Sequence, residues 1–301
     1  MRTLEYLGDP VMRGLFLPGI VTGVAIAIVC ACLAVLVVLK RMSFIGQGVS
    51  HAAFGGMGVA AFLGLTGASL SAGEAVGQFS IILAFCLAAA MIVAAMSARR
   101  GTSADTAIGI VLVASMTLGA ILMHAAFKRQ GSQGPGWESV LFGAILSVGW
   151  SDAKIAVFVS IAILAVLWWE RRKLVFWAFD ETSAPAFGVP PRSPRIVLMV
   201  LLCLAIVTAM KLAGVILATA VLVLPGATAL ALSRRLSRVI AISVGSSLVA
   251  LVLGLVASME LDWPPGACIV GAMTAIYAGA RLASLVGTAR ESGTPGAGAE
   301  A

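Results

Sequence analysis

Residues 14–39, GLFLPGIVTGVAIAIVCACLAVLVVL, decide the fold, and Lys40 and Arg41 follow them at once. A helix needs about 20 apolar residues to cross a bilayer, whereas the apolar core of a secretion signal has only about 7–15. The run is longer than such a core, and no small-x-small cleavage site follows it. We therefore predict a membrane-spanning helix that is retained in the protein.

The composition of the whole chain is that of a polytopic membrane protein. Of its 301 residues, 60% are hydrophobic and only 11% are charged, and the mean hydropathy is +1.07. Soluble domains have about 45–50% apolar and about 25% charged residues. This difference excludes soluble enzymes, nucleic-acid-binding modules and disordered chains. We assign the net charge of +7 to Lys and Arg in cytoplasmic loops, not to a nucleic-acid partner.

Further apolar runs predict nine spans, or eight if the sixth and seventh form one broken element across residues 211–214. The fold class is therefore all-α, with eight or nine transmembrane helices. The runs lie near 14–39, 48–66, 79–98, 105–126, 152–169, 194–212, 213–232, 238–259 and 265–283.

Lys and Arg are distributed unevenly between the loops that these spans define. If the N-terminus lies outside, fourteen of them fall in inner segments and six in outer segments. Because Lys and Arg are enriched on the cytoplasmic side, we expect the N-terminus outside and the C-terminus inside.

The outer loop 128–151 contains a short apolar piece, Val140 to Val148. It is too short to span a bilayer, so we expect it to lie at the interface with Trp137 and Trp150 as anchors.

The longest cytoplasmic segment, residues 171–195, has a short helix-like core from Phe179 to Gly188. Residues 288–301 are rich in Gly, Pro and Ala and are predicted to be a disordered tail. The remaining residues, 1–287, form a single predicted transmembrane domain.

Sequence motifs of catalysis are absent. The chain has no G-x-x-x-x-G-K-S/T phosphate loop, no H-E-x-x-H and no G-x-S-x-G. We therefore predict that it is not an enzyme. The cysteines fall inside apolar runs without a C-x-x-C pair, and we interpret all five as small buried apolar residues: Cys30, Cys32, Cys86, Cys203 and Cys268.

Polar and small residues share the second predicted span. Gln47 and His51 are four residues apart and so lie on one helix face. Beside them runs a row of small residues, which allows another helix backbone to approach closely. This predicted packing row is Gly48, Ala52, Gly56, Ala60 and Gly64.

Two positions have alternative interpretations from the residues alone. His51 is either a neutral histidine that holds helices together by a hydrogen bond, or a ligand for a metal such as Zn²⁺, Mn²⁺ or Fe²⁺, with Gln47 as a weak supplementary ligand. Pro225 interrupts an apolar run and predicts either a simple kink or a bend that lines a pathway.

Five blocks of sequence resemble the membrane permease subunit of manganese/zinc/iron-type ABC importers. Residues 40–52, KRMSFIGQGVSHA, resemble the family signature R-R-x-S-L-I-G-D/E-A-L-S-H-A. The other blocks follow in the family's order, so that the resemblance covers roughly residues 15–285. They are residues 105–110, 141–146, 179–190 and 211–229.

The resemblance implies a permease in a prokaryotic cell membrane, with the helical fold of the vitamin B12-type (type II) importers. It implies transport of zinc, manganese or iron by alternating access, with no cofactor bound by this chain. The implied partners are two cytoplasmic ATPase subunits that hydrolyse ATP, an extracytoplasmic metal-binding protein, a second permease copy that is identical or similar, and membrane lipid. The implied ATPase-coupling residues are Phe179, Asp180, Glu181, Phe187 and Gly188.

The metal-contacting pair of the family falls on Gln47 and His51. His51 matches, but a carboxylate is usual where this chain has Gln47. Two other classes stay open: a secondary transporter driven by an ion gradient, and a membrane scaffold that transports nothing.

Overall fold

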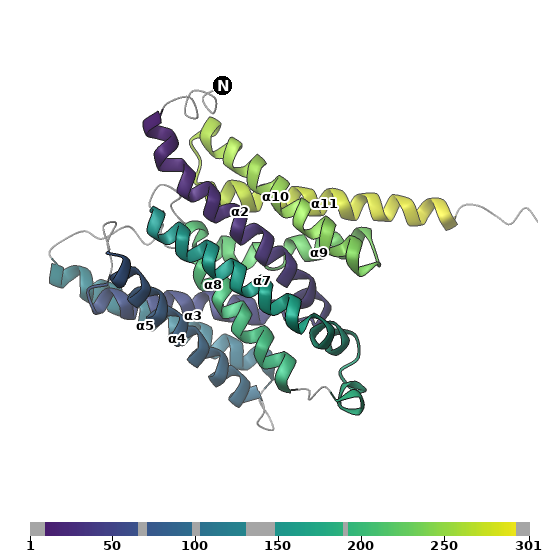
Figure 1. Cartoon of the computed structure of the whole chain (residues 1–301), viewed down its shortest axis with the longest axis horizontal. Coiled ribbons are helices and arrows are strands. Elements are labelled where there is room, and N and C mark those ends of the chain that lie inside the picture. The colour runs from purple at the N-terminus through teal and green to yellow at the C-terminus, as the bar shows by residue number, and fades with distance from the viewer. Residues whose placement is uncertain (1–9, 66–70, 98–102, 131–147, 189–191, 293–301) are drawn as a thin grey trace, which may run out of the picture.

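The computed structural model describes residues 10–65, 71–97, 103–130, 148–188 and 192–292, almost all of them helical (Figure 1). This confirms the predicted all-α fold. The elements are α2 (Pro10–Leu39), α3 (Ser43–Phe62), α4 (Ala72–Ser97), α5 (Ala104–Gln130), α7 (Trp150–Phe179), the 3₁₀ helix η2 (Ala184–Phe187), α8 (Arg192–Val221), α9 (Leu224–Leu232), α10 (Leu236–Leu261) and α11 (Pro265–Ser292).

The helices form three groups, and α2 lies in the middle group although it comes first in the chain (Figure 1). Helices α3, α4 and α5 lie together on one side, α2, α7 and α8 lie in the middle, and α9, α10 and α11 lie on the other side. Helix α3 packs against α4, α5 and α8, whereas α10 packs against α2, α9 and α11. The C-terminal part of α11 extends away from the other helices.

Among the described residues, eight segments are long and apolar enough to cross a membrane. Helix α3 would be a ninth such segment but does not belong to that set, because its glycines, Gln47 and His51 lower its hydropathy. Its position explains how it tolerates them. Most of its residues are buried against neighbouring helices, so they do not have to face lipid.

Helix α8 is broken where the sixth predicted span meets the seventh. Gly214 has φ 69° and ψ 173°, which is not helical and which a residue with a Cβ rarely adopts. A second break follows at residues 222–223, and α9 begins at Leu224 with Pro225 in its first turn. Pro225 therefore starts a new helix instead of kinking a continuous one, since a first-turn residue needs no N–H partner.

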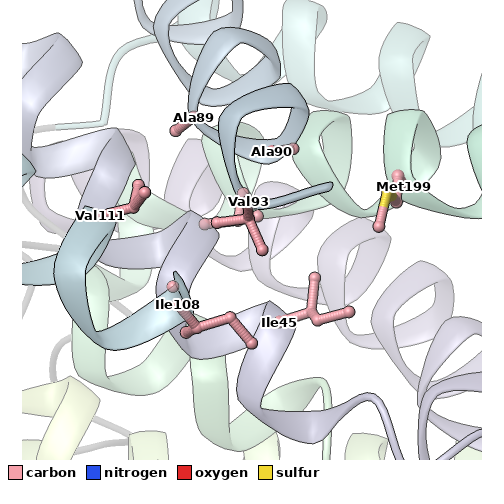
Figure 2. Close-up of a pocket in the computed structure, with 9 residues that line it drawn as sticks. Ile45, Ala89, Ala90, Val93, Ile108, Val111 and Met199 are labelled. Atoms are coloured by element: carbon pink, nitrogen blue, oxygen red, sulfur yellow. The ribbon is translucent and has the colours of Figure 1, made fainter. Parts of the chain in front are cut away.

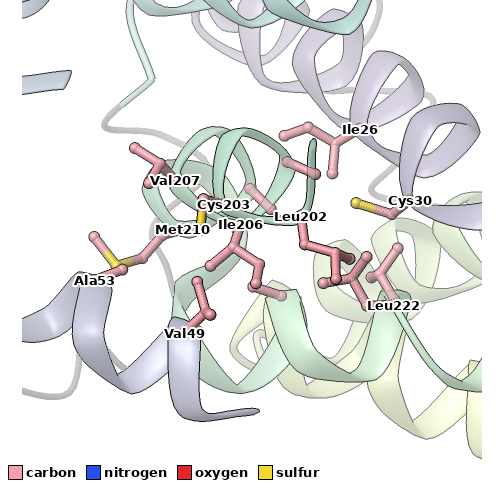
Figure 3. Close-up of a cluster of buried hydrophobic side chains, with 14 of the residues drawn as sticks. Ile26, Cys30, Val49, Ala53, Leu202, Cys203, Ile206, Val207, Met210 and Leu222 are labelled. Carbon is pink, nitrogen blue, oxygen red and sulfur yellow. The ribbon is translucent and has the colours of Figure 1, made fainter. Parts of the chain in front are cut away.

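The core is built mainly from α2, α3 and α8. In Figure 3, Ile26 and Cys30 of α2 and Val49 of α3 surround Leu202 and Ile206 of α8. The cysteines are all free; Cys30, Cys86 and Cys203 are buried, whereas Cys32 and Cys268 are half-buried. Two of the five are thus less buried than predicted.

Several helix boundaries differ from the predictions; α3 and α4, for example, begin at Ser43 and Ala72, five and seven residues before the predicted spans. Helix α7 continues through a charged stretch to Phe179, ten residues past the predicted end of the span. The ion pair between Lys173 and Glu170, 3.0 Å apart, supports that extension. Helix α11 runs to Ser292, so residues 288–292 of the predicted disordered tail are helical. Residues 293–301 and nearly all of the predicted interfacial piece, 140–147 with Trp137, lie outside the described residues.

Candidate functional site in the second long helix and the loop after α7

Gln47 lies in the first turns of α3, and its side chain is exposed. It lines a recess of about 270 Å³ that faces the broken region of the chain. The opposite wall comes from Thr219 and Ala220 at the end of α8 and from Val223 in the gap before α9. The break next to Pro225 therefore lies beside the polar face of α3.

His51 is half-buried one turn further along α3. Its Nδ1 atom is buried and has no hydrogen-bond partner within the described part of the chain. The described residues contain no group of three or more His, Cys, Asp or Glu side chains that could hold a metal. One chain therefore contributes only a neutral imidazole and a neutral amide on this face, an incomplete set of ligands for a divalent cation.

A different cavity on α3 is apolar. Figure 2 shows Ile45 of α3 facing Val93 of α4, Ile108 of α5 and Met199 of α8. The side chains that line it offer no oxygen or nitrogen ligand. It separates packed helices and does not resemble an ion site.

The predicted small residues lie on more than one side of α3. A Cβ on Gly48 would lie 2.8 Å from Cγ2 of Ile108, and a Cβ on Gly56 would lie 2.9 Å from the Cα of Ile82 on α4. Ala52 and Ala60 are fully buried. Gly64 is different, because α3 ends at Phe62 and Gly64 has φ 79° in the turn that follows. The predicted helical row therefore stops before Gly64.

One close contact between α3 and α5 involves a glycine pair that sequence reasoning missed. A Cβ on Gly58 would lie 2.6 Å from both the Cα and the carbonyl oxygen of Gly119. A Cβ on Gly119 would in turn lie 2.8 Å from the carbonyl oxygen of Phe54, so both positions favour glycine. The signal in the sequence was weak, because α3 carries glycines on several faces and nothing marks which of them meets α5.

The predicted coupling residues surround the end of α7. Phe179 is its last residue and Asp180 is its C-cap. The Asp180 carboxylate accepts hydrogen bonds from the backbone N–H groups of Ser183, at 3.0 Å, and Thr182, at 3.1 Å. These bonds lower the pKa of Asp180. We predicted that Asp180 and Glu181 begin a helix, but they form a turn between α7 and η2.

The rest of this loop is compact and displays two aromatic rings. Gly188, at φ 75°, ends η2 by donating its N–H to Pro185 at 3.1 Å. Phe187 meets Phe176 edge-on, with ring centroids 5.2 Å apart. Phe179 and Phe187 nevertheless remain 66% and 73% exposed. Exposed rings held by a rigid loop are typical of a surface that another protein covers.

Glu181 connects the loop to the turn between α2 and α3. Its carboxylate lies 2.9 Å from Nζ of Lys40. The hydrogen bond from Lys40 lowers the pKa of Glu181. The same ammonium lies 4.1 Å from the centre of the ring of Trp177, which is buried in the last turns of α7.

This geometry defines the class of protein: a multi-pass helical membrane protein with a polar recess beside a broken helix and a compact loop that displays aromatic rings. Residues 12–284 match the family described as the ABC 3 transport family. The match covers most of the chain, and the chain belongs to this family.

Proteins similar to this chain agree with this assignment. The chain is 27% identical over 273 residues to a "Probable iron transport system membrane protein" of Haemophilus influenzae, covering 91% of this chain and 95% of the relative. It is 31% identical over 251 residues to the manganese import system permease protein ScaB of Streptococcus parasanguinis. This match covers 83% of this chain and 84% of the relative. Among solved structures, it is similar to a chain of PsaBC from Streptococcus pneumoniae in complex with Fab, with a TM-score of 0.78 and 30% sequence identity. The match covers 92% of this chain and 93% of the solved chain.

Proposed function

We propose that this chain is the membrane permease subunit of an ATP-driven importer for a divalent transition-metal ion, either manganese, zinc or iron. The observation that carries the proposal is the family match over residues 12–284, together with relatives described as manganese and iron transport proteins. The chain moves the ion by alternating access and hydrolyses no ATP itself.

The ion passes along the exposed polar face of α3. Gln47 supports this route because it faces an open recess, and His51 supports it because a ring nitrogen lies buried without a partner in the described structure. A second permease copy, identical or similar, completes the ligand set, since one chain offers two neutral donors. Lipid covers the outer apolar faces.

Gln47 weakens the hold on the ion in comparison with the carboxylate that the family usually carries. An anionic ligand within about 4 Å of a divalent cation adds a strong attraction that a neutral amide lacks. The Gln47→Glu variant should therefore retain the ion more tightly and release it more slowly than the wild type.

The loop that displays Phe179 and Phe187 lies on the cytoplasmic side and seats an ATPase subunit, of which the importer has two. The excess of Lys and Arg in the segments on that side supports this orientation, with the N-terminus outside. An extracytoplasmic binding protein delivers the ion to the opposite side. Residues 1–287 act as one membrane domain.

The test is metal uptake by proteoliposomes that contain the permease, its ATPase and its binding protein. Uptake of Mn²⁺, Zn²⁺ and Fe²⁺ is measured separately, with and without ATP. We expect ATP-dependent uptake of at least one ion. His51→Ala should reduce it by about tenfold or more, since a direct ligand is lost. His124→Ala is the matched control, because His124 is exposed on α5.

Two outcomes would contradict the proposal. Uptake by the permease without any ATPase would indicate a secondary transporter. Unchanged cellular manganese, zinc and iron after deletion of the chain would indicate a scaffold. Equal uptake by His51→Ala and His124→Ala would remove His51 from the ion path while leaving the class of transporter intact.

A further inference from the structure

Lys40 occupies an unusual position for a lysine. Its side chain is only 12% exposed, although it lies in the short connection between α2 and α3. The ammonium group contacts both the carboxylate of Glu181 and the ring of Trp177. Glu181 is 51% exposed, so the pair is partly open to water, but the buried position of Lys40 leaves it less screened than a pair between two fully exposed side chains.

The contact joins parts of the chain that are far apart in sequence. Trp177 and Glu181 belong to the end of α7 and the loop that follows, more than 130 residues from Lys40. The packed ring and the ion pair hold the lysine from two directions, since a cation over an aromatic face and a cation beside a carboxylate are both attracted. A shift of the loop therefore pulls on the α2–α3 connection.

That connection is short and rigid. The N–H of Met42 bonds to the carbonyl of Val37 at 2.9 Å, and the N–H of Arg41 bonds to that of Val38 at 3.1 Å. With Arg41 at φ 55°, these bonds form a Schellman turn, a motif that usually places glycine in the left-handed position. A turn closed in this way cannot absorb a displacement by unwinding, so a displacement of Lys40 passes into α3.

Helix α3 begins at Ser43, directly after this turn, and carries the polar face. Gln47 lies one turn further along, about 6 Å along the helix axis. The chain thus has a continuous path of packed and bonded groups from the aromatic loop to the recess. The turn between α2 and α3 does not by itself fix the direction of the Lys40 side chain, which is set by its contacts with Glu181 and Trp177.

We propose that Lys40 is a positioning residue that couples the loop after α7 to α3, so that movement of the loop changes the position of the Gln47 face. This inference rests on the proposed function, because it gives the loop its ATPase and α3 its ion. It adds a residue pair, Lys40 with Glu181, through which nucleotide-driven movement reaches the ion path.

The experiment uses the complete importer in proteoliposomes and measures ions taken up per ATP hydrolysed. The probe is whichever of Mn²⁺, Zn²⁺ and Fe²⁺ the wild type takes up. In Lys40→Met and Glu181→Gln, the ratio should fall about fivefold or more, which is the lower range of coupling between linked sites. In Lys40→Met, which lies outside the loop that seats the ATPase, ATP hydrolysis and assembly with the ATPase should persist. Lys40→Arg should retain most of the ratio, since it keeps the charge.

The matched control is Glu170→Gln, which breaks a different ion pair, the one with Lys173 on α7. It should leave the ratio unchanged. The exchanged variant, Lys40→Glu with Glu181→Lys, should recover part of the ratio and keeps the test informative if a single variant assembles poorly.

The outcomes separate this inference from the proposed function. A wild-type importer that transports, with the same ratio in Lys40→Met and Glu181→Gln, would overturn the coupling role and leave the function standing. Equal losses in Glu170→Gln would also overturn it, because any charge change on α7 would then suffice. A wild type that takes up none of the three ions would contradict the proposed function and remove the basis of the inference.

Discussion

The contact between Gly58 and Gly119 allows a quantitative prediction about the packing of α3 on α5. The Gly58→Ala substitution places a methyl group 2.6 Å from the Cα and the carbonyl oxygen of Gly119. Carbon atoms in contact prefer separations of about 3.5–4.0 Å, so the two backbones must separate locally by about 1 Å. Overpacking of this kind costs about 1–3 kcal/mol. Helix α3 is also packed against α4 and α8, so it has little room to retreat.

The control removes the effect of helix propensity. Alanine is favoured over glycine in a helix by about 1 kcal/mol, and this gain accompanies any Gly-to-Ala change in α3 or α5. Gly109 on α5 has no atom within 4 Å of its added Cβ, so Gly109→Ala should be neutral or stabilising. Gly58→Ala should therefore be about 1–3 kcal/mol less stable than Gly109→Ala.

Unfolding in detergent, by heat and by titration with a denaturing detergent, measures this difference. For a chain of this size, each kcal/mol corresponds to roughly 2–4 °C in the midpoint. If Gly58→Ala unfolds at the same temperature as Gly109→Ala, then the backbone contact does not determine the packing of α3, and the reasoning is wrong.

Three further predictions concern other parts of the molecule. Gly226→Ala should destabilise the protein by about 1–3 kcal/mol relative to Gly245→Ala. A Cβ at Gly226 would lie 2.5 Å from the carbonyl oxygen of Ala34, whereas a Cβ at Gly245 would meet no atom within 4 Å. Equal unfolding midpoints of the two variants would contradict this prediction. Gly188→Val should weaken copurification of the ATPase, whereas Gly188→Asn should be tolerated, because asparagine adopts the left-handed conformation of Gly188 more readily than valine does. Equal recovery of the ATPase with both variants would exclude a role for this turn. The hydrogen bond and ion pair with Lys40 lower the pKa of Glu181. The pair therefore stabilises the fold fully above the usual glutamate pKa of about 4.3, and this contribution is lost as the pH falls through the lower pKa of the folded state. The thermal midpoints of the wild type and Glu181→Gln should converge in acid, and a difference that stays constant with pH would refute the assignment.

The sequence predicted the features that local chemistry controls. The apolar runs identified the long helices because a span needs about 20 apolar residues in succession. The break at Gly214 was also predicted, and so was an interruption at Pro225, although as a kink or bend and not as the start of a new helix. Glycine and proline are the residues that interrupt a helix most strongly. Placing Gln47 and His51 on one face required only the helical period.

The remaining features depend on contacts between distant segments. Nothing local to Lys40 indicates that its partner is Glu181, because the pair exists only after α2 and α7 have packed together. The meeting of Gly58 with Gly119 depends in the same way on how α3 is rotated against α5. The extension of α7 was missed because a helix can leave the bilayer without an apolar run to mark it.

The low hydropathy of α3 has a consequence for the biogenesis of the protein. An insertion machinery that selects segments by their apolarity would recognise α2 and α4 readily but α3 only weakly, because its amide, imidazole and glycines are tolerated only once other helices cover them. Helix α3 must therefore enter the bilayer together with a neighbour, as part of a hairpin. A nascent chain released before α4 has been synthesised would leave this polar helix in water.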